Sequence, residues 1–195
     1  MALKVTIAPT ELPLTLDQVK AHLRVTSSTE DADILSYLRA AVDLLDAPSG
    51  LLNRAIITQT LSMTLDGFPR LRFALPCPPM VSVSSVAYID TDGNTQTLAT
   101  SVYRVLNAAA PNTRGRVELE IDQAWPTTQA VSQSVTVTWV AGYGARNAVP
   151  HRVRLLLLSM IKTMYDDRAP MTDKTMTFTP AFKGLLNLSS FPAVG

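Results

Sequence analysis

The spacing of apolar residues changes twice along this chain, and that change constrains the fold more than any other feature. Apolar residues recur with the 3.6-residue period of a helix from about residue 13 to 47, and they alternate with polar residues from about 54 to 141. After Pro150 the helical period returns. No long helical segment interrupts the alternating region, which disfavours a parallel, doubly wound sheet. The sequence therefore predicts an α+β fold, in which helices from the two ends form a small bundle and an antiparallel β region is inserted between them.

Short signals mark where the helices begin and end. Thr15 with Gln18 three residues later is a capping box, which is typical of the start of a helix. Asp31 and its acidic neighbours indicate the start of a second helix, because carboxylates favour the positive end of the helix dipole. A third helix is predicted from Arg152 to Asp167. Its apolar residues spread well beyond one face, so we expect neighbouring subunits to bury part of it.

Alternating runs between residues 57 and 140 predict at least five short strands, and Asp92-Gly93 predicts a turn between two of them. The last 27 residues show no sustained period but keep apolar side chains that disordered tails usually lack. We therefore divide the chain into an N-terminal helical part (1–53), an inserted antiparallel β region (54–148), a C-terminal helix that completes the bundle (149–168) and an extended docking tail (169–195).

Composition limits the function classes. Hydrophobic residues make up 47% of the 195 residues, enough for a core without disulfides, and charged residues make up 17%. That charged fraction is below the ~25% of typical soluble domains, which indicates a surface hidden in an assembly. The net charge of +1 argues against a protein that coats nucleic acid. The sequence contains no apolar run of about 18 residues, so it predicts no membrane span.

The chemistry-bearing residues are sparse. Cys77 is the single cysteine, and neither His22 nor His151 has a second ligand at helical spacing. We therefore expect no catalytic, cofactor-binding or metal-binding residues and no enzymatic activity. A small-ligand binder or a thiol enzyme is a lesser alternative, which requires a histidine to fold against the Cys77 thiol.

Several motifs, taken in order, carry a resemblance. They are the helix 14–25, the acidic start 30–35, Gln59-Thr60, Leu65-Asp66-Gly67-Phe68-Pro69, the segments 75–83 and 88–93, Tyr103, Trp125-Pro126, Ala141-Gly142-Tyr143 and Val149-Pro150. In this order they resemble the long form, with a β insertion, of the head–tail connector (adaptor) proteins of tailed bacteriophages and phage-derived gene transfer agents. The resemblance covers about residues 13–168.

The resemblance implies a structural protein of the virion or phage-like particle that is present in the host cytoplasm during assembly. It implies a homo-oligomeric ring, a dodecamer, with the portal protein above and a stopper or tail protein below. Double-stranded DNA would pass through the channel without sequence-specific contact, and no membrane is involved. A neck stopper or tail-terminator protein is the alternative within the same assembly, but those proteins are expected to be mostly β.

Two groups of residues are candidates for contact with the portal or an adjacent subunit. Four consecutive leucines (155–158) point all round a helix at about 100° per residue, so one core does not accommodate all of them. We expect the C-terminal helix to divide its apolar residues between its own core and a partner, and the tail to dock through its large apolar side chains. The candidates are Leu155, Leu156, Leu158, Ile161, Phe178, Phe182, Leu185, Leu186 and Phe191.

Overall fold

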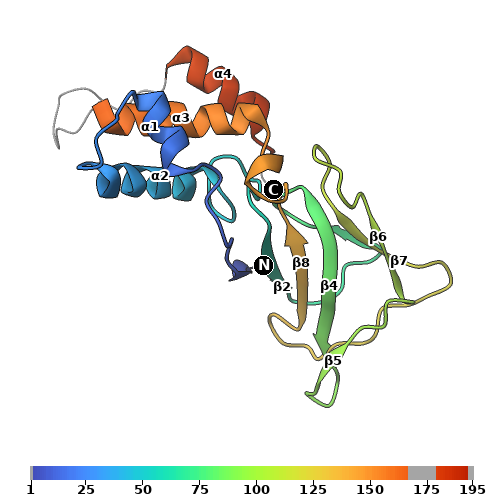
Figure 1. Ribbon diagram of the computed structural model, residues 1–195. Coiled ribbons are helices and arrows are strands. Elements are labelled where there is room, and N and C mark those ends of the chain that lie inside the picture. Colours follow the sequence, from blue (N-terminus) through green and yellow to red (C-terminus); the bar gives the residue numbers. More distant parts are fainter. Residues whose placement is uncertain (1, 167–178, 193–195) are drawn as a thin grey trace.

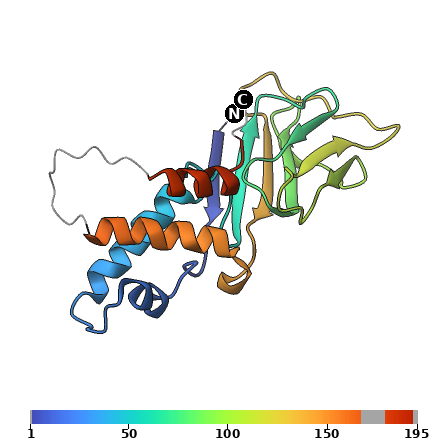
Figure 2. The ribbon, with the colours of Figure 1, turned by 90° about the horizontal axis from the view of Figure 1, so that it is seen from above.

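The computed structural model describes residues 2–166 and 179–192, which form a helical module and a β module side by side (Figures 1 and 2). The helical module contains α1 (Leu16–Leu23), α2 (Asp31–Leu45), α3 (His151–Asp166) and α4 (Pro180–Ser189). The β module contains eight strands, and a short 3₁₀ helix (Arg146–Ala148) leads from its last strand to α3. Each module has its own cluster of buried apolar side chains.

Helix α3 is the centre of the helical module, because it contacts α1, α2 and α4 (Figure 1). Its buried residues face those of α2 in one core; from the two helices these are Ile34, Leu38, Ala41, Leu45, Val153, Leu156, Leu157, Met160 and Ile161. The predicted capping box is present: Gln18 N–H donates to Thr15 Oγ1 and Thr15 N–H donates to Gln18 Oε1. Helix α2 begins at Asp31, as its acidic residues predict.

The β module consists of two antiparallel sheets. The five-stranded sheet has the order β1 (Ala2–Ile7), β2 (Gln59–Leu65), β8 (Val135–Ala141), β4 (Met80–Ile89) and β5 (Thr95–Thr97). The three-stranded sheet has the order β3 (Arg72–Ala74), β7 (Arg116–Leu119) and β6 (Tyr103–Leu106). Trp139 and Leu61 from the first sheet share a core with Phe73 and Val117 from the second. The alternating pattern thus becomes one buried face on each sheet.

These observations confirm the α+β fold with an antiparallel β insertion between N-terminal and C-terminal helices. The predicted turn lies between β4 and β5, where Gly93 has a φ of +85°, a conformation that glycine adopts without strain.

Two features of the predicted organisation are wrong. Residues 2–7 were expected in the N-terminal helical part, but they form β1 and pair with β2 in the sheet. The tail was expected to be extended, but its described part contains the ten-residue helix α4, which packs on α3. Helix formation there hides Phe182, Leu185 and Leu186 against the helical core, which an extended segment would leave in water.

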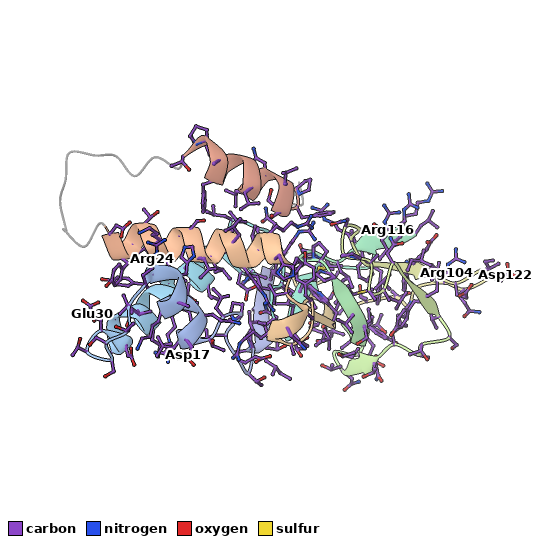
Figure 3. The ribbon with its side chains drawn as sticks, turned by 45° about the horizontal axis from the view of Figure 1, so that its top comes forward. Asp17, Arg24, Glu30, Arg104, Arg116 and Asp122 are labelled. Carbon is purple, nitrogen blue, oxygen red and sulfur yellow. The ribbon has the colours of Figure 1, made fainter. Side chains whose placement is uncertain are left out.

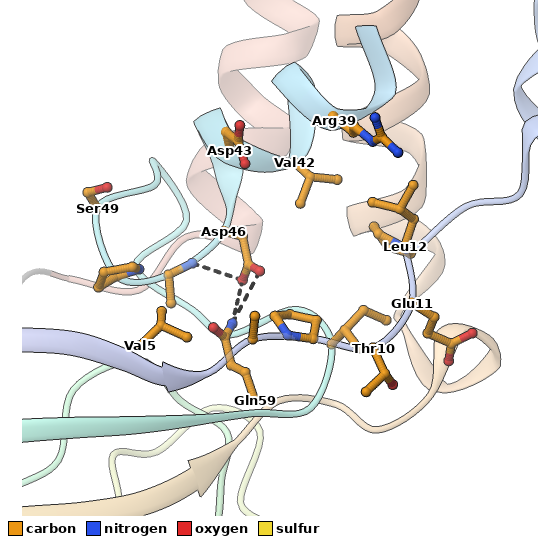
Figure 4. Close-up of a pocket in the computed structure, with 16 residues that line it drawn as sticks. Val5, Thr10, Glu11, Leu12, Arg39, Val42, Asp43, Asp46, Ser49 and Gln59 are labelled. Carbon is orange, nitrogen blue, oxygen red and sulfur yellow. Dashed lines mark hydrogen bonds between the residues drawn. The ribbon is translucent and has the colours of Figure 1, made fainter. Parts of the chain in front are cut away.

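A buried carboxylate lies where the two modules meet. Asp46 follows α2 and is 8% exposed; its Oδ1 accepts from the backbone N–H groups of Ala47 and Ile56, each at 2.8 Å. Gln59 Nε2, at the start of β2, lies 3.2 Å from both carboxylate oxygens. Asp46 and Gln59 lie beside a cavity of about 580 Å³ between α2, the N-terminal segment and β2 (Figure 4). Asp46 therefore ties the end of the helical module to the first strand that follows it.

Asp46 predicts a pH-dependent stability. Burial raises the pKa of its carboxyl from 3.8 to about 6, so the folded protein keeps this proton in a range where the unfolded chain has released it. The stabilisation is complete below about pH 4 and is lost as the pH rises to about 6, on the order of 2–3 kcal/mol. An Asp46→Asn variant should lose this pH dependence, because an amide does not titrate in this range. Its carbonyl can still accept from the two backbone donors. Urea unfolding of both proteins at several pH values between 4 and 7 tests this. The same change of the free energy of unfolding with pH in both proteins would contradict it.

Candidate assembly surface

Helix α3 divides its candidate residues between the inside and the outside of the subunit. Leu156 and Ile161 are completely buried in the subunit's own core, and Leu158 is half-buried against it. Leu155 is 49% exposed. The proposed contact of α3 with a partner therefore depends on Leu155, with the edge of Leu158 beside it, because Leu156 and Ile161 are not accessible on the folded subunit.

Leu155 lies in a polar stripe along α3. His151, one turn before it, and Lys162, two turns after it, are both exposed. Lys162 pairs with Asp166 at 2.9 Å on the same stripe. Leu155 is the one large apolar residue that α3 exposes within the described part of the chain, so it is the position on this helix where a partner would cover apolar surface.

The C-terminal arm, residues 179–192, folds back on its own subunit. Thr179 caps α4 by accepting from Phe182 N–H at 3.2 Å, and Pro180 occupies the first turn, which suits proline. The candidates Phe182, Leu185 and Leu186 pack against the helical core, whereas Leu188 is 75% exposed. The remaining tail candidate, Phe178, lies outside the described residues.

Phe191 is held at the end of the arm by a group of residues that we call the clasp: Leu52, Asn53, Arg54 and Arg114. Phe191 N–H donates to the Leu52 carbonyl at 2.8 Å, and its carbonyl accepts from Asn53 Nδ2 at 3.0 Å. Two guanidinium groups, those of Arg54 and Arg114, lie over its ring, each with its central carbon 5.1 Å from the ring centroid. Both contacts have cation–π geometry.

Arg54 is the buried centre of the clasp, with 3% of its surface exposed. Its Nε donates to the carbonyl of Ser189 at 2.7 Å, and its Nη2 donates to Asn112 Oδ1 at 3.2 Å. Nη1 donates to the carbonyl of Pro111 and lies 3.3 Å from the Tyr143 hydroxyl. Burial lowers the pKa of Arg54, but arginine stays charged at any ordinary pH. One guanidinium thus joins the arm, the loop between β6 and β7, and the segment after β8.

Charged side chains of both signs lie at both ends of the molecule (Figure 3). The figure labels Asp17, Arg24 and Glu30 at the helical end, and Arg104, Arg116 and Asp122 at the β end. Arg104 pairs with Glu118 at 3.5 Å on the three-stranded sheet. A surface that binds DNA tightly needs a continuous patch of positive charge, whereas each end of this molecule carries charges of both signs.

The chemistry of Cys77 is that of a structural residue. The thiol is buried in the core of the β module, and burial, followed by the charge of Asp46, raises its pKa to about 12. His22 and His151 are exposed on their helices, so neither is folded against the buried thiol. Across residues 2–166 and 179–192, no three His, Cys, Asp or Glu side chains are grouped as metal ligands would be. No helix in these ranges is long and apolar enough to cross a membrane.

Cys77 is therefore expected to be unreactive in the folded protein. A maleimide at pH 7 should label it at least tenfold more slowly than it labels the same protein in denaturant, because the thiolate is scarce and the thiol is covered. Mass spectrometry of the labelled chain gives both rates. Rapid stoichiometric labelling of the folded protein would contradict this and would favour a thiol enzyme.

Comparison with known proteins adds a full-length structural likeness. The sequence matches no protein-family profile and no curated protein. Its fold is similar to a chain in the virion of a native gene transfer agent particle, with a TM-score of 0.78 and 22% identity over 100% of this chain and 97% of that chain. A chain from the neck of an empty particle, computed with C6 symmetry, gives the same values. A third, from the neck of a native particle computed with C12 symmetry, has a TM-score of 0.76 and 21% identity with the same coverage.

The likeness covers the helical module, the β insertion and the C-terminal region together, since each comparison spans the whole of this chain. At 21–22% identity it shows a shared fold. The class that the fold defines is an α+β chain of the kind found in gene transfer agent particles.

Proposed function

We propose that this protein is a structural adaptor of a tailed phage or phage-like particle, a head–tail connector that forms a ring beneath the portal. The observation that carries the proposal is the likeness, over the full length, to chains in the virion and neck of gene transfer agent particles. The motifs between residues 13 and 168 support the same assignment independently, because their resemblance to adaptors concerns sequence and not shape.

A ring of twelve copies is part of the proposal. Two of the similar chains come from necks computed with C6 and C12 symmetry, which supports a cyclic assembly. A head-to-tail ring needs two different surfaces on each subunit. The helical module offers Leu155 and the C-terminal arm, and the β module offers its exposed loops.

The ring joins the portal above it to a stopper or tail protein below it, and double-stranded DNA passes through its channel. A net charge of +1 on 195 residues suits a passage without tight binding. The protein is present in the host cytoplasm during assembly and then acts in the assembled particle. Its role is structural and not enzymatic.

The alternatives are weaker on specific grounds. A stopper or tail-terminator protein is expected to be mostly β, whereas four helices within residues 2–166 and 179–192 build one of the two modules. A thiol enzyme needs an activated cysteine, and burial raises the pKa of Cys77 to about 12.

Deletion of the gene tests the proposed role. Without the adaptor, heads are expected to fill with DNA but to remain without tails, because the portal has no partner surface for the next component. Electron microscopy of the particles, with expression of the intact protein from a plasmid as the control, gives the result. Tailed particles at the normal number, or heads that never fill, would contradict an adaptor role.

A further inference from the structure

The clasp has the properties of a peptide-binding site. Its donors are directed at backbone carbonyls of the arm: Arg54 at Ser189, Asn53 at Phe191, and Arg114, through Nη2, at Pro192. The two guanidinium groups also contact one aromatic ring, that of Phe191. The site therefore holds the end of α4 and the residues that follow it, with Phe191 as the single aromatic anchor. None of these contacts depends on which copy of the chain supplies the arm.

The clasp also lies between the modules. Leu52, Asn53 and Arg54 belong to the segment that leads from α2 to β2, whereas Arg114 belongs to the loop between β6 and β7. A filled clasp thus joins the helical module to a loop of the β module. An arm that came from another copy would tie both modules of the receiving subunit to its neighbour.

The length of the chain before the arm allows this. Twelve residues, 167–178, separate the end of α3 from Thr179. Twelve residues span at most about 40 Å when extended, which is comparable with the width of a small domain.

We propose that adjacent copies exchange arms in the ring, so that residues 179–192 of one subunit fill the clasp of the next. The exchange rests on the proposed function, because it requires a ring. Every contact made within one chain is replaced by the identical contact between two chains, so the exchange has no cost in contacts. Each subunit then gives an arm on one side and receives one on the other, which is the head-to-tail contact that a closed ring needs. In a ring the neighbour's clasp is also present at a high effective concentration.

Cross-linking between two tagged chains tests the exchange. One chain carries Leu188→Cys on the exposed side of the arm, and the other carries Thr113→Cys, next to the Asn112 side chain that binds Arg54; both carry Cys77→Ser. Particles are assembled from an equal mixture and treated with a bismaleimide that has a spacer of roughly 10 Å. Neither chain can link to itself at these sites, so a product containing both tags reports an arm in a neighbour's clasp.

Two controls separate exchange from mere proximity. Adding Phe191→Ala to the Leu188→Cys chain should reduce the two-tag product at least tenfold, because the anchor of the arm is lost. Replacing the Thr113→Cys chain by an Asp33→Cys chain, which places the thiol at the start of α2, should give no two-tag product. A single chain with both Leu188→Cys and Thr113→Cys measures how much linking occurs within one copy.

The outcomes distinguish the two proposals. A two-tag product that depends on Phe191 supports arm exchange. Linking confined to the two-cysteine chain, in particles that contain the protein at the normal level, overturns exchange and leaves the adaptor role intact. Absence of the protein from the particles overturns both.

Discussion

An aspartate in place of Leu155 is expected to abolish assembly while the subunit stays folded. Leu155 is 49% exposed and lies among polar residues on α3, so a carboxylate there has access to water in the free subunit. In a ring contact the same carboxylate would be buried without a partner, at a cost of several kcal/mol in each of the repeated interfaces. We therefore expect the yield of infectious or transducing particles to fall at least 100-fold.

The control for Leu155→Asp is Ser36→Asp, which adds the same charge at an exposed position of α2. Thermal unfolding of both variants should match that of the unmodified protein within about 2 °C, and only Leu155→Asp should reduce the particle yield. Normal particles made from Leu155→Asp subunits would show that this face of α3 is not part of an interface.

Replacing Arg54 with alanine is expected to lower the free energy of unfolding by about 3–5 kcal/mol. The side chain is buried and donates to acceptors in three separate segments, the arm, the loop between β6 and β7, and the segment after β8 that holds Tyr143. Its removal leaves the carbonyls of Ser189 and Pro111 without this donor, and it takes away one of the two cations at the ring of Phe191. Losing one partner in a buried polar network is among the largest effects that a single substitution causes.

Arg116→Ala is the matched control for Arg54→Ala. Arg116 is exposed on the three-stranded sheet, so its loss should change stability by less than about 0.5 kcal/mol (Figure 3). Urea unfolding monitored by tryptophan fluorescence measures both variants. Equal stability of Arg54→Ala and Arg116→Ala would mean that the clasp does not hold the modules together.

The order of the main elements could be predicted because each of them has a local signal. The capping box of Thr15 and Gln18 and the alternation from residue 59 to 65 act within a few residues, and both formed the expected structure. Strand β1 has only six residues, and its partner β2 lies more than 50 residues further along the chain. The alternation of Leu3, Val5 and Ile7 is typical of a strand, but three apolar residues are a weak indication by themselves.

Helix α4 was missed although its signals are present. Thr179 and Pro180 are a typical N-cap and first turn, and Phe182, Leu185 and Leu186 have helical spacing. Gly184 and the prolines of the tail hid that short run within a segment that has no sustained period. A ten-residue helix is also too short to be stable alone, so its formation depends on the face that α3 offers.

The clasp was beyond prediction from the sequence. Arg54 gains its role from Pro111, Asn112, Tyr143 and Ser189, which are 57 to 135 residues away. Before folding, nothing distinguishes this arginine from the exposed ones on the three-stranded sheet. The same holds for Leu155 against Leu156: they are neighbours in sequence, and only the packing of α3 between α2 and α4 decides which of them reaches the surface.

The most direct test of the adaptor role is an electron-microscopy map of the particle neck, with the symmetry of the ring imposed only after it has been found. The expected map shows a ring of twelve copies of this chain directly beneath the portal, with Leu155 covered by a neighbouring chain and DNA density in the central channel. A map in which this chain is missing from the neck, or in which it forms part of the tail tube, would contradict the adaptor role.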